Sequence, residues 1–193
     1  MSVATGLIVL LGLLQASAGT FEIELWPGEG RPVFEATGQA VTLYEDAATS
    51  AKRKGQLTVQ RGQSIAFDET RYRTVAAGRL RALLATQVSG RIVGPVGRMS
   101  RMEYYRGKFP PGTKSIAPGA TLEFLQYRAE GTCFVRVDGD VIDSDPCPAT
   151  DARAFQVEAD PKVEWWIRVV SAGTPIGWVM VDDGVIGVVR REF

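Results

Sequence analysis

The acidic residues are the side chains of this sequence best suited to do chemistry, because the sequence contains no histidine. Histidine is the usual general base near neutral pH and the commonest zinc ligand. Its absence excludes Ser-His-Asp and Cys-His catalysis and histidine-bound zinc. A pair of carboxylates can still hydrolyse a glycosidic bond if the two groups face each other across a cleft. The candidates for such a pair are Asp138, Asp140, Asp143, Asp145, Asp182 and Asp183.

These acids stand in sequences that are typical of hairpin turns. The motifs are Asp-Gly-Asp at 138–140 and Asp-Asp-Gly at 182–184, and Asp is favoured in turns because its side chain hydrogen-bonds to the nearby backbone. We therefore interpret the acids as turn residues. The segment 138–145 also resembles an oxygen-rich calcium loop, but it lacks the EF-hand spacing and the closing glutamate. The sequence predicts no metal site and no cofactor.

Residues 1–18 have the features of an export signal. The apolar run LIVLLGLL at 7–14 is followed by Ala16-Ser17-Ala18, whose small side chains suit signal peptidase. The run is about half as long as a membrane-spanning helix. We expect cleavage after Ala18 and a periplasmic or secreted protein with no integral membrane segment. Because the first residues carry no Lys or Arg, an uncleaved anchor and a buried core helix are the alternatives.

The two cysteines, Cys133 and Cys147, stand beside turn-forming residues. An even number of cysteines outside the cytoplasm predicts one intramolecular disulfide. In the chain-entropy description, a closed loop of about 15 residues stabilises the folded state by about 3 kcal/mol. The alternative, a redox-active or metal-binding pair, would need Cys-x-x-Cys spacing and further ligands, which the sequence lacks.

The charge is balanced, with 22 basic and 22 acidic residues, so no overall field attracts nucleic acid or an anionic membrane. We therefore expect no nucleic acid partner. The basic residues that gather are interpreted as solvated turns. They are Lys52, Arg53 and Lys54, and the spread of Arg91, Arg98, Arg101, Arg106 and Lys108.

Short strands separated by turns must position these residues. Alternating apolar and polar side chains, with glycine or charged residues between the runs, predict strands. The predicted strands are at 21–25, 40–44, 55–60, 64–67, 71–75, 91–93, 120–127, 132–137, 163–170, 177–181 and 185–190. The segment 79–88 fits either a strand or a helical turn, because periodicity does not separate the two over so short a run. The pattern favours an all-β fold made of small barrels.

A Gly- and Pro-rich stretch at 104–118 interrupts the strand pattern, and we predict that it is a linker. It divides the chain after the signal into an N-terminal strand and lead-in at 19–38, a first module at 39–103 and a second module with the cysteine loop at 119–193. The two modules open with similar residues, at 39–43 and 119–122, which supports a degenerate duplication.

The segment EWWIRVVSAGTPIGWVMV at 164–181 resembles the closing part of a bacterial SH3-like (SH3b) domain, where an aromatic strand leads by a short turn to a Gly-Trp-Val strand. The segment 39–67 resembles the opening of such a domain. The first half has Gly-Arg-Ile-Val-Gly at 90–94 in place of the Gly-Trp-Val strand, and the second half carries a cysteine loop that such domains do not usually need. The resemblance implies two small SH3-like β-barrels in tandem.

The same resemblance implies where a ligand binds. Bacterial SH3-like domains of exported proteins often bind cell-wall peptide or another protein across exposed aromatic side chains, and the matching residues here are Tyr44, Trp166 and Trp178. Alternation sends Trp165 and Trp166 to opposite faces of their strand, so one is expected in the core and the other at the surface or in an interface. For Trp178, core packing is the alternative.

The expected function is a non-enzymatic exported binding module that recognises a cell-envelope ligand, which is a peptide, peptidoglycan or a protein partner. Two alternatives stay open. One is a structural accessory subunit of an envelope complex, which pairs an exposed sheet edge with a partner strand. The other is a small carboxylate-dependent glycan hydrolase.

Overall fold

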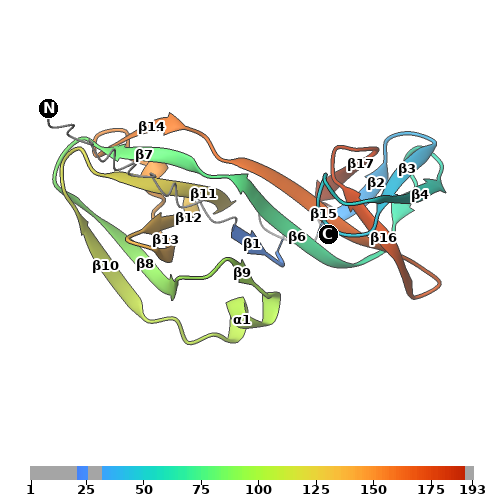
Figure 1. Ribbon diagram of the computed structural model, residues 1–193, viewed down its shortest axis with the longest axis horizontal. Coiled ribbons are helices and arrows are strands. Elements are labelled where there is room, and N and C mark those ends of the chain that lie inside the picture. Colours follow the sequence, from blue (N-terminus) through green and yellow to red (C-terminus); the bar gives the residue numbers. More distant parts are fainter. Residues whose placement is uncertain (1–20, 26–31, 190–193) are drawn as a thin grey trace, which may run out of the picture.

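The computed structural model describes residues 21–25 and 32–189. Within these residues the chain is almost entirely β-strand, with one short α-helix and one 3-10 turn (Figure 1). The predicted all-β class is therefore confirmed. The predicted export signal at 1–18 lies outside the described residues. In the described part, none of the helices has the length and apolar character needed to cross a membrane.

The strands form three sheets. The first sheet contains, in spatial order, β4 (Arg53–Thr58), β3 (Ala40–Tyr44), β16 (Thr174–Met180), β15 (Lys162–Ser171), β6 (Phe67–Ala76), β1 (Phe21–Ile23) and β9 (Arg98–Met99). The second contains β10 (Pro111–Ile116), β8 (Thr86–Gly94), β13 (Asp140–Ser144), β12 (Thr132–Val137), β11 (Thr121–Ala129), β7 (Gly78–Ala82) and β14 (Phe155–Ala159). The third contains β17 (Val185–Val189), β2 (Pro32–Ala36) and β5 (Ser64–Ile65). The helical elements are α1 (Arg101–Arg106) and the 3-10 turn η1 (Pro148–Thr150).

The sheets are arranged in a smaller and a larger lobe, which the long strands β6 and β15 connect (Figure 1). These two strands pair antiparallel from Lys162↔Ala76 to Val169↔Phe67. In the smaller lobe, segments far apart in the sequence meet, because β17 pairs with β2 and β16 pairs with β3. The larger lobe is built from the chain between β7 and β14 together with β1, whose Phe21 and Ile23 pack against Leu125 and Phe134.

Strand pairing therefore crosses the boundary predicted at 104–118. This segment contains α1 and β10, and β10 pairs with β8 inside the second sheet. The two seven-stranded sheets end in edge strands, so no closed barrel is found among the described strands, and two SH3-like barrels in tandem stay a prediction. Alternation along one strand specifies which face is buried, but it does not specify which strand lies beside it. For this reason the pairing was not readable from the sequence.

The central strands of the larger lobe are buried on both faces. Phe134 and Val135 are neighbours in β12 and both are 0% exposed, but they belong to different core clusters. One cluster contains the two cysteines, and the other is covered by β1, β9 and α1. Burial on both faces explains the nearly continuous apolar run at 132–137. The segment 79–88 lies in β7, a bend and β8, so its strand alternative is confirmed.

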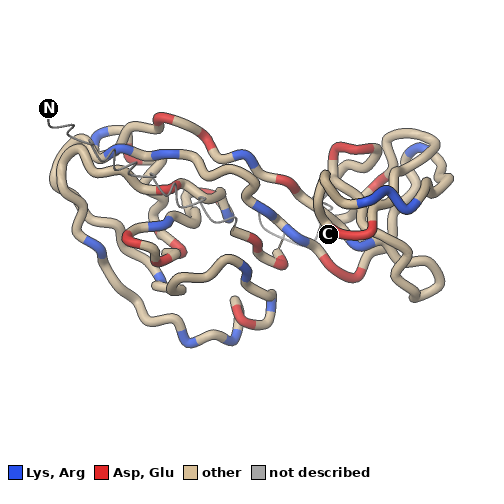
Figure 2. The backbone as a smooth tube through the Cα atoms, in the orientation of Figure 1, with Lys and Arg blue, Asp and Glu red and all other residues tan. Residues whose placement is uncertain are grey.

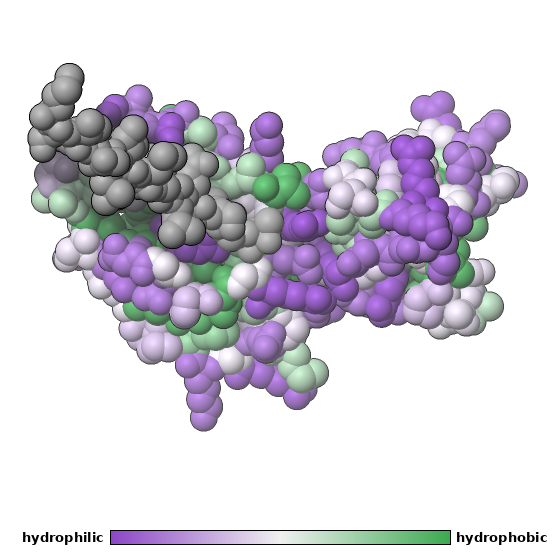
Figure 3. All heavy atoms as spheres, in the orientation of Figure 1, coloured by the Kyte–Doolittle hydropathy of each residue, from purple (hydrophilic) through white to green (hydrophobic). Residues whose placement is uncertain are grey.

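Charges of both signs alternate along both lobes and along β6 and β15 (Figure 2), as the balanced composition predicts. Hydrophilic side chains cover much of the narrow region between the lobes (Figure 3). In β6, Arg71 Nε lies 3.5 Å from a carboxylate oxygen of Glu22, and Arg71 Nη1 lies 2.8 Å from one of Asp46. These ion pairs connect β1, β6 and the loop after β3.

Candidate functional site

The structure brings the three predicted ligand-binding residues together in one buried cluster. Trp166 is 0%, Trp178 4% and Tyr44 7% exposed, and all three pack together with Ala47. The rings of Tyr44 and Trp166 meet edge to face, with their centroids 5.3 Å apart. Such contacts stabilise a core beyond the area that they bury. The rings therefore offer little surface to a ligand, and a ligand-binding role for them stays a prediction.

Polar groups surround this aromatic cluster. The Trp166 indole Nε1 donates a hydrogen bond of 2.9 Å to Glu164, and the Arg71 guanidinium lies 4.2 Å from the centre of the Trp178 ring. On the opposite face of β15, Trp165 is half-buried against Phe34, with ring centroids 5.0 Å apart. The prediction that the two tryptophans face opposite sides is confirmed: Trp166 is the core residue of the pair, and Trp165 is partly buried on the other face.

A cavity in the larger lobe that carries two arginines in its lining was missed by sequence reasoning. It lies between β8, β10, β13 and α1 and has a volume of about 470 Å³. We call it the guanidinium cavity, and its lining residues are Ser89, Gly90, Arg91, Tyr104, Pro111, Gly112, Thr113, Arg128, Asp143 and Asp145.

The centre of the guanidinium cavity is the carboxylate of Asp143, whose side chain is 3% exposed. Arg91 stands opposite Asp143 in the pairing of β8 with β13, and its Nε donates to Oδ2 at 3.0 Å. Arg128 Nε donates to Oδ1 at 2.9 Å, and the Tyr104 hydroxyl donates to Oδ2 at 3.1 Å. Both carboxylate oxygens are thus engaged, and the carboxylate fixes the two guanidinium groups.

Tyr104 reaches this centre from α1, a helix with a capping box at its start. The Ser100 hydroxyl accepts a hydrogen bond from the backbone N–H of Glu103 at 3.1 Å, and the Glu103 carboxylate accepts one from the Ser100 N–H at 2.7 Å. A capping box fixes the first turn of a helix. The Tyr104 ring also lies 4.6 Å from the Arg91 guanidinium, so α1 holds one wall of the cavity in place.

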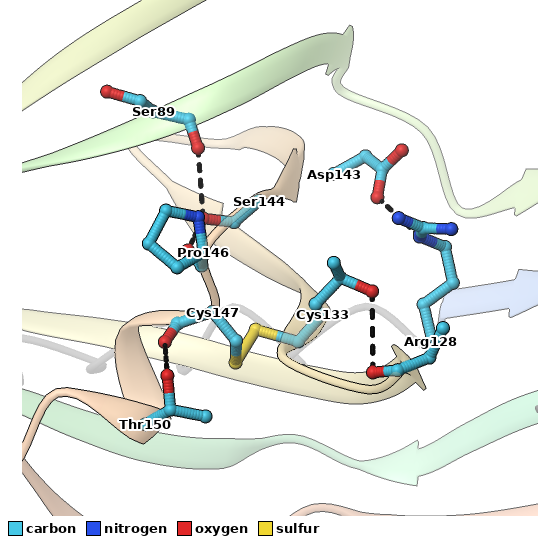
Figure 4. Close-up of a disulfide and its surroundings, with 10 residues drawn as sticks. Ser89, Arg128, Cys133, Asp143, Ser144, Pro146, Cys147 and Thr150 are labelled. Carbon is cyan, nitrogen blue, oxygen red and sulfur yellow. Dashed lines mark hydrogen bonds and ion pairs between the residues drawn. A yellow bond between two sulfur atoms is a disulfide. The ribbon is translucent and has the colours of Figure 1, made fainter. Parts of the chain in front are cut away.

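The predicted disulfide lies beside the cavity. Cys133 and Cys147 are bonded, and both are 0% exposed (Figure 4). In the same view the Ser144 hydroxyl lies 3.0 Å from the carbonyl oxygen of Ser89 and 2.9 Å from that of Pro146, while Arg128 points toward Asp143. These contacts tie the chain after β13 to β8 and so hold the cavity rim.

The guanidinium cavity is suited to binding an anion. Arg91 and Arg128 together carry far more N–H donors than the single Asp143 carboxylate can accept. Their side chains are 41% and 28% exposed, so solvent or a ligand reaches them. A carboxylate held by two prepositioned guanidinium groups forms charge-assisted hydrogen bonds, which are the strong ones. Asp145, the second acidic residue of the lining, is exposed.

Asp143 was assigned to a turn, and the structure corrects this, because it lies in β13; Arg91 lies in β8, where a strand is predicted. The turn interpretation holds for Asp138 and Asp182, which have positive φ angles of 50° and 86° in tight turns. Sequence spacing gave no sign that Asp143 faces Arg91, because the pairing of β8 with β13 decides it. Among residues 21–25 and 32–189, no three acidic or sulfur ligands gather into a metal site.

Burial, followed by the charge of Asp143, raises the pKa of Tyr104 from 10.0 to about 12. Because the folded-state pKa is the higher one, the Tyr104 proton stabilises the folded protein fully below pH 10, and this contribution is lost as the pH rises to about 12. We expect the free energy of unfolding of Tyr104→Phe to fall less steeply across this window than that of the wild type. Denaturant titrations at several pH values measure both curves, and parallel curves would contradict the prediction.

Comparison with known proteins found no match to any family model, to any curated protein or to any solved structure.

Proposed function

We propose that this protein is an exported, non-catalytic binding module that recognises a carboxylate-bearing ligand of the cell envelope in the guanidinium cavity. The observation that carries the proposal is the pair Arg91 and Arg128, fixed on opposite oxygens of one buried carboxylate beside a cavity of about 470 Å³. Binding sites of this kind combine a concave surface with a few polar groups that are already in place.

Two further observations support export and envelope ligands. A buried disulfide suits an oxidising compartment, where disulfides persist. The leader-like sequence at 1–18 suits passage to that compartment. The resemblance of 164–181 to bacterial SH3-like domains adds that the ligand is a peptide, peptidoglycan or a protein partner.

A non-catalytic role suits the way in which Asp143 is held. Its Oδ1 accepts from Arg128, and its Oδ2 accepts from Arg91 and Tyr104. A carboxylate that hydrolyses a glycosidic bond must offer an oxygen or a proton to the substrate. Both oxygens of Asp143 instead accept hydrogen bonds from neighbouring side chains, so Asp143 acts as a group that positions these side chains.

The test measures binding of the oxidised protein without residues 1–18 to two probes. One is purified peptidoglycan, and the other is a heptapeptide library attached to beads by the N-terminus, so that each peptide ends in a free carboxylate. Arg128→Gln removes one charge and leaves Asp143 its contacts with Arg91 and Tyr104. We expect this variant to raise the dissociation constant at least about tenfold, because a charge-assisted hydrogen bond is lost.

The matched control is Arg153→Gln, which changes an exposed arginine of the same lobe outside the cavity. It is expected to bind like the wild type. Amidation of the library carboxylates should abolish binding to the beads. Equal binding by Arg128→Gln and the wild type, or no binding of the wild type to either probe, would overturn the proposed function.

A further inference from the structure

The guanidinium cavity adjoins a free sheet edge. Its lining includes Pro111, Gly112 and Thr113 of β10, and β10 is the end strand of the second sheet, with β8 as its sheet neighbour among the described residues. An edge strand presents a row of unpaired backbone groups, which can pair with another chain.

The register shows which backbone groups point outward. The N–H of Ile92 donates to the carbonyl of Pro110 at 2.9 Å, and Pro111 stands opposite Arg91 in the next pair. Hydrogen-bonded and non-bonded pairs alternate along an antiparallel ladder. The N–H and C=O groups of Thr113 and Ser115, and the C=O of Pro111, therefore face away from β8, toward the open edge.

The side chains of β10 leave this edge accessible. Lys114, its one charged residue, forms an ion pair with Asp140 at 2.9 Å and lies on the face opposite to that of Thr113. Thr113 faces the cavity side, where its hydroxyl lies 3.0 Å from that of Ser89. A charged side chain pointing along the edge would discourage strand addition, and β10 has none in that position.

We propose that an extended peptide adds as a strand to the outer edge of β10, antiparallel to it, with its C-terminal carboxylate in the guanidinium cavity. The inference rests on the proposed function and names its ligand class. The direction follows from the cavity position, because the cavity lies at the Pro111 end of β10 and an antiparallel peptide ends there. Backbone hydrogen bonds along the edge would supply affinity, and the guanidinium groups would select a free C-terminus.

The opposite edge of the same sheet provides a matched comparison. The N–H of Leu83 donates to the carbonyl of Ala154 at 2.8 Å, and Phe155 pairs with Ala82. By the same alternation, the N–H of Val157 in β14 faces outward. Thr113→Pro and Val157→Pro thus each remove one outward backbone donor without removing a hydrogen bond of the sheet.

The experiment uses heptapeptides selected from the free-carboxylate library. We expect Thr113→Pro to weaken their binding at least tenfold and Val157→Pro to leave it unchanged. Amide hydrogen exchange on the wild-type protein provides a readout that does not depend on how the variants fold. Saturation with a selected peptide should slow exchange at Thr113 and Ser115 by tenfold or more and leave Val157 unaffected.

The outcomes separate this inference from the proposed function. Selected peptides that bind through Arg128 but do not slow amide exchange at Thr113 and Ser115 would overturn strand addition and leave the proposed function standing. The same holds if peptidoglycan binds through Arg128 and no peptide is selected. Strand addition by a peptide would also be overturned if the protein formed a dimer without peptide and Thr113→Pro dissociated that dimer. A second copy of the chain would then occupy the edge of β10. Absence of binding to both probes overturns both proposals together.

Discussion

Replacing Trp166 by alanine should lower the free energy of unfolding by about 4 kcal/mol, the cost typical of removing a large aromatic side chain from a core. The ring is 0% exposed, meets Tyr44 edge to face and donates its indole hydrogen to Glu164. The variant loses these contacts and leaves a cavity between β3, β15 and β16. Urea denaturation followed by circular dichroism measures the change.

The control for this prediction is Tyr105→Ala. Tyr105 is 64% exposed on α1, so its truncation should change the free energy of unfolding by less than about 0.5 kcal/mol. A change below about 1 kcal/mol for Trp166→Ala would show that the aromatic cluster is not packed as described. Because the expected loss of stability is large, reduced ligand binding by Trp166→Ala would reflect unfolding of the protein and not the loss of a contact with the ligand. The Arg128→Gln variant is therefore the better probe of the site.

The second large effect is expected for Asp143→Ala, which should cost about 3 kcal/mol of folding free energy. Removing one partner of a buried ion pair costs about 3–5 kcal/mol, and the lower end applies because Arg91 and Arg128 keep partial contact with solvent. The substitution also leaves the Tyr104 hydroxyl without its acceptor. Denaturant unfolding at neutral pH measures the loss.

Asp68→Ala provides the comparison, because Asp68 binds Arg168 through two hydrogen bonds of 2.8 and 2.9 Å in an exposed setting. Exposed ion pairs contribute about 0–1 kcal/mol, so this variant should be nearly as stable as the wild type. Equal losses of folding free energy for Asp68→Ala and Asp143→Ala would contradict the conclusion that the buried Asp143 carboxylate holds Arg91 and Arg128 in place. At equal degrees of folding, Asp143→Ala should also bind the carboxylate probe more weakly, since its two guanidinium groups are no longer fixed.

Local chemistry made several features predictable from the sequence. The two cysteines form the predicted disulfide, and tight turns lie at Asp138 and Asp182. The turn at Asp138 joins the paired strands β12 and β13, whereas the strands on either side of Asp182 belong to different sheets. Most strands lie near their predicted places, because alternation reports burial over neighbouring residues. Alternation also placed Trp165 and Trp166 on opposite faces, but it does not show whether a second layer covers each face, as Phe34 covers Trp165.

The candidate site could not be read from the sequence, because it is assembled from distant segments. Arg91, Tyr104, Arg128 and Asp143 come from β8, α1, β11 and β13, and each looks like an ordinary surface or turn residue in its own segment. Their contacts exist because Asp143 stands opposite Arg91 in the register and because α1 lies over that face of the sheet.

The sequence by itself determined the all-β class, the disulfide and the turns, since these depend on residue types within a few positions of one another. Only the tertiary structure decided which strands pair, that β2 and β17 lie side by side, and that two arginines meet one buried aspartate. The physical reason is that strand pairing is non-local. Hydrogen bonds between strands are available to any extended segment, and the choice among partners depends on how whole faces pack.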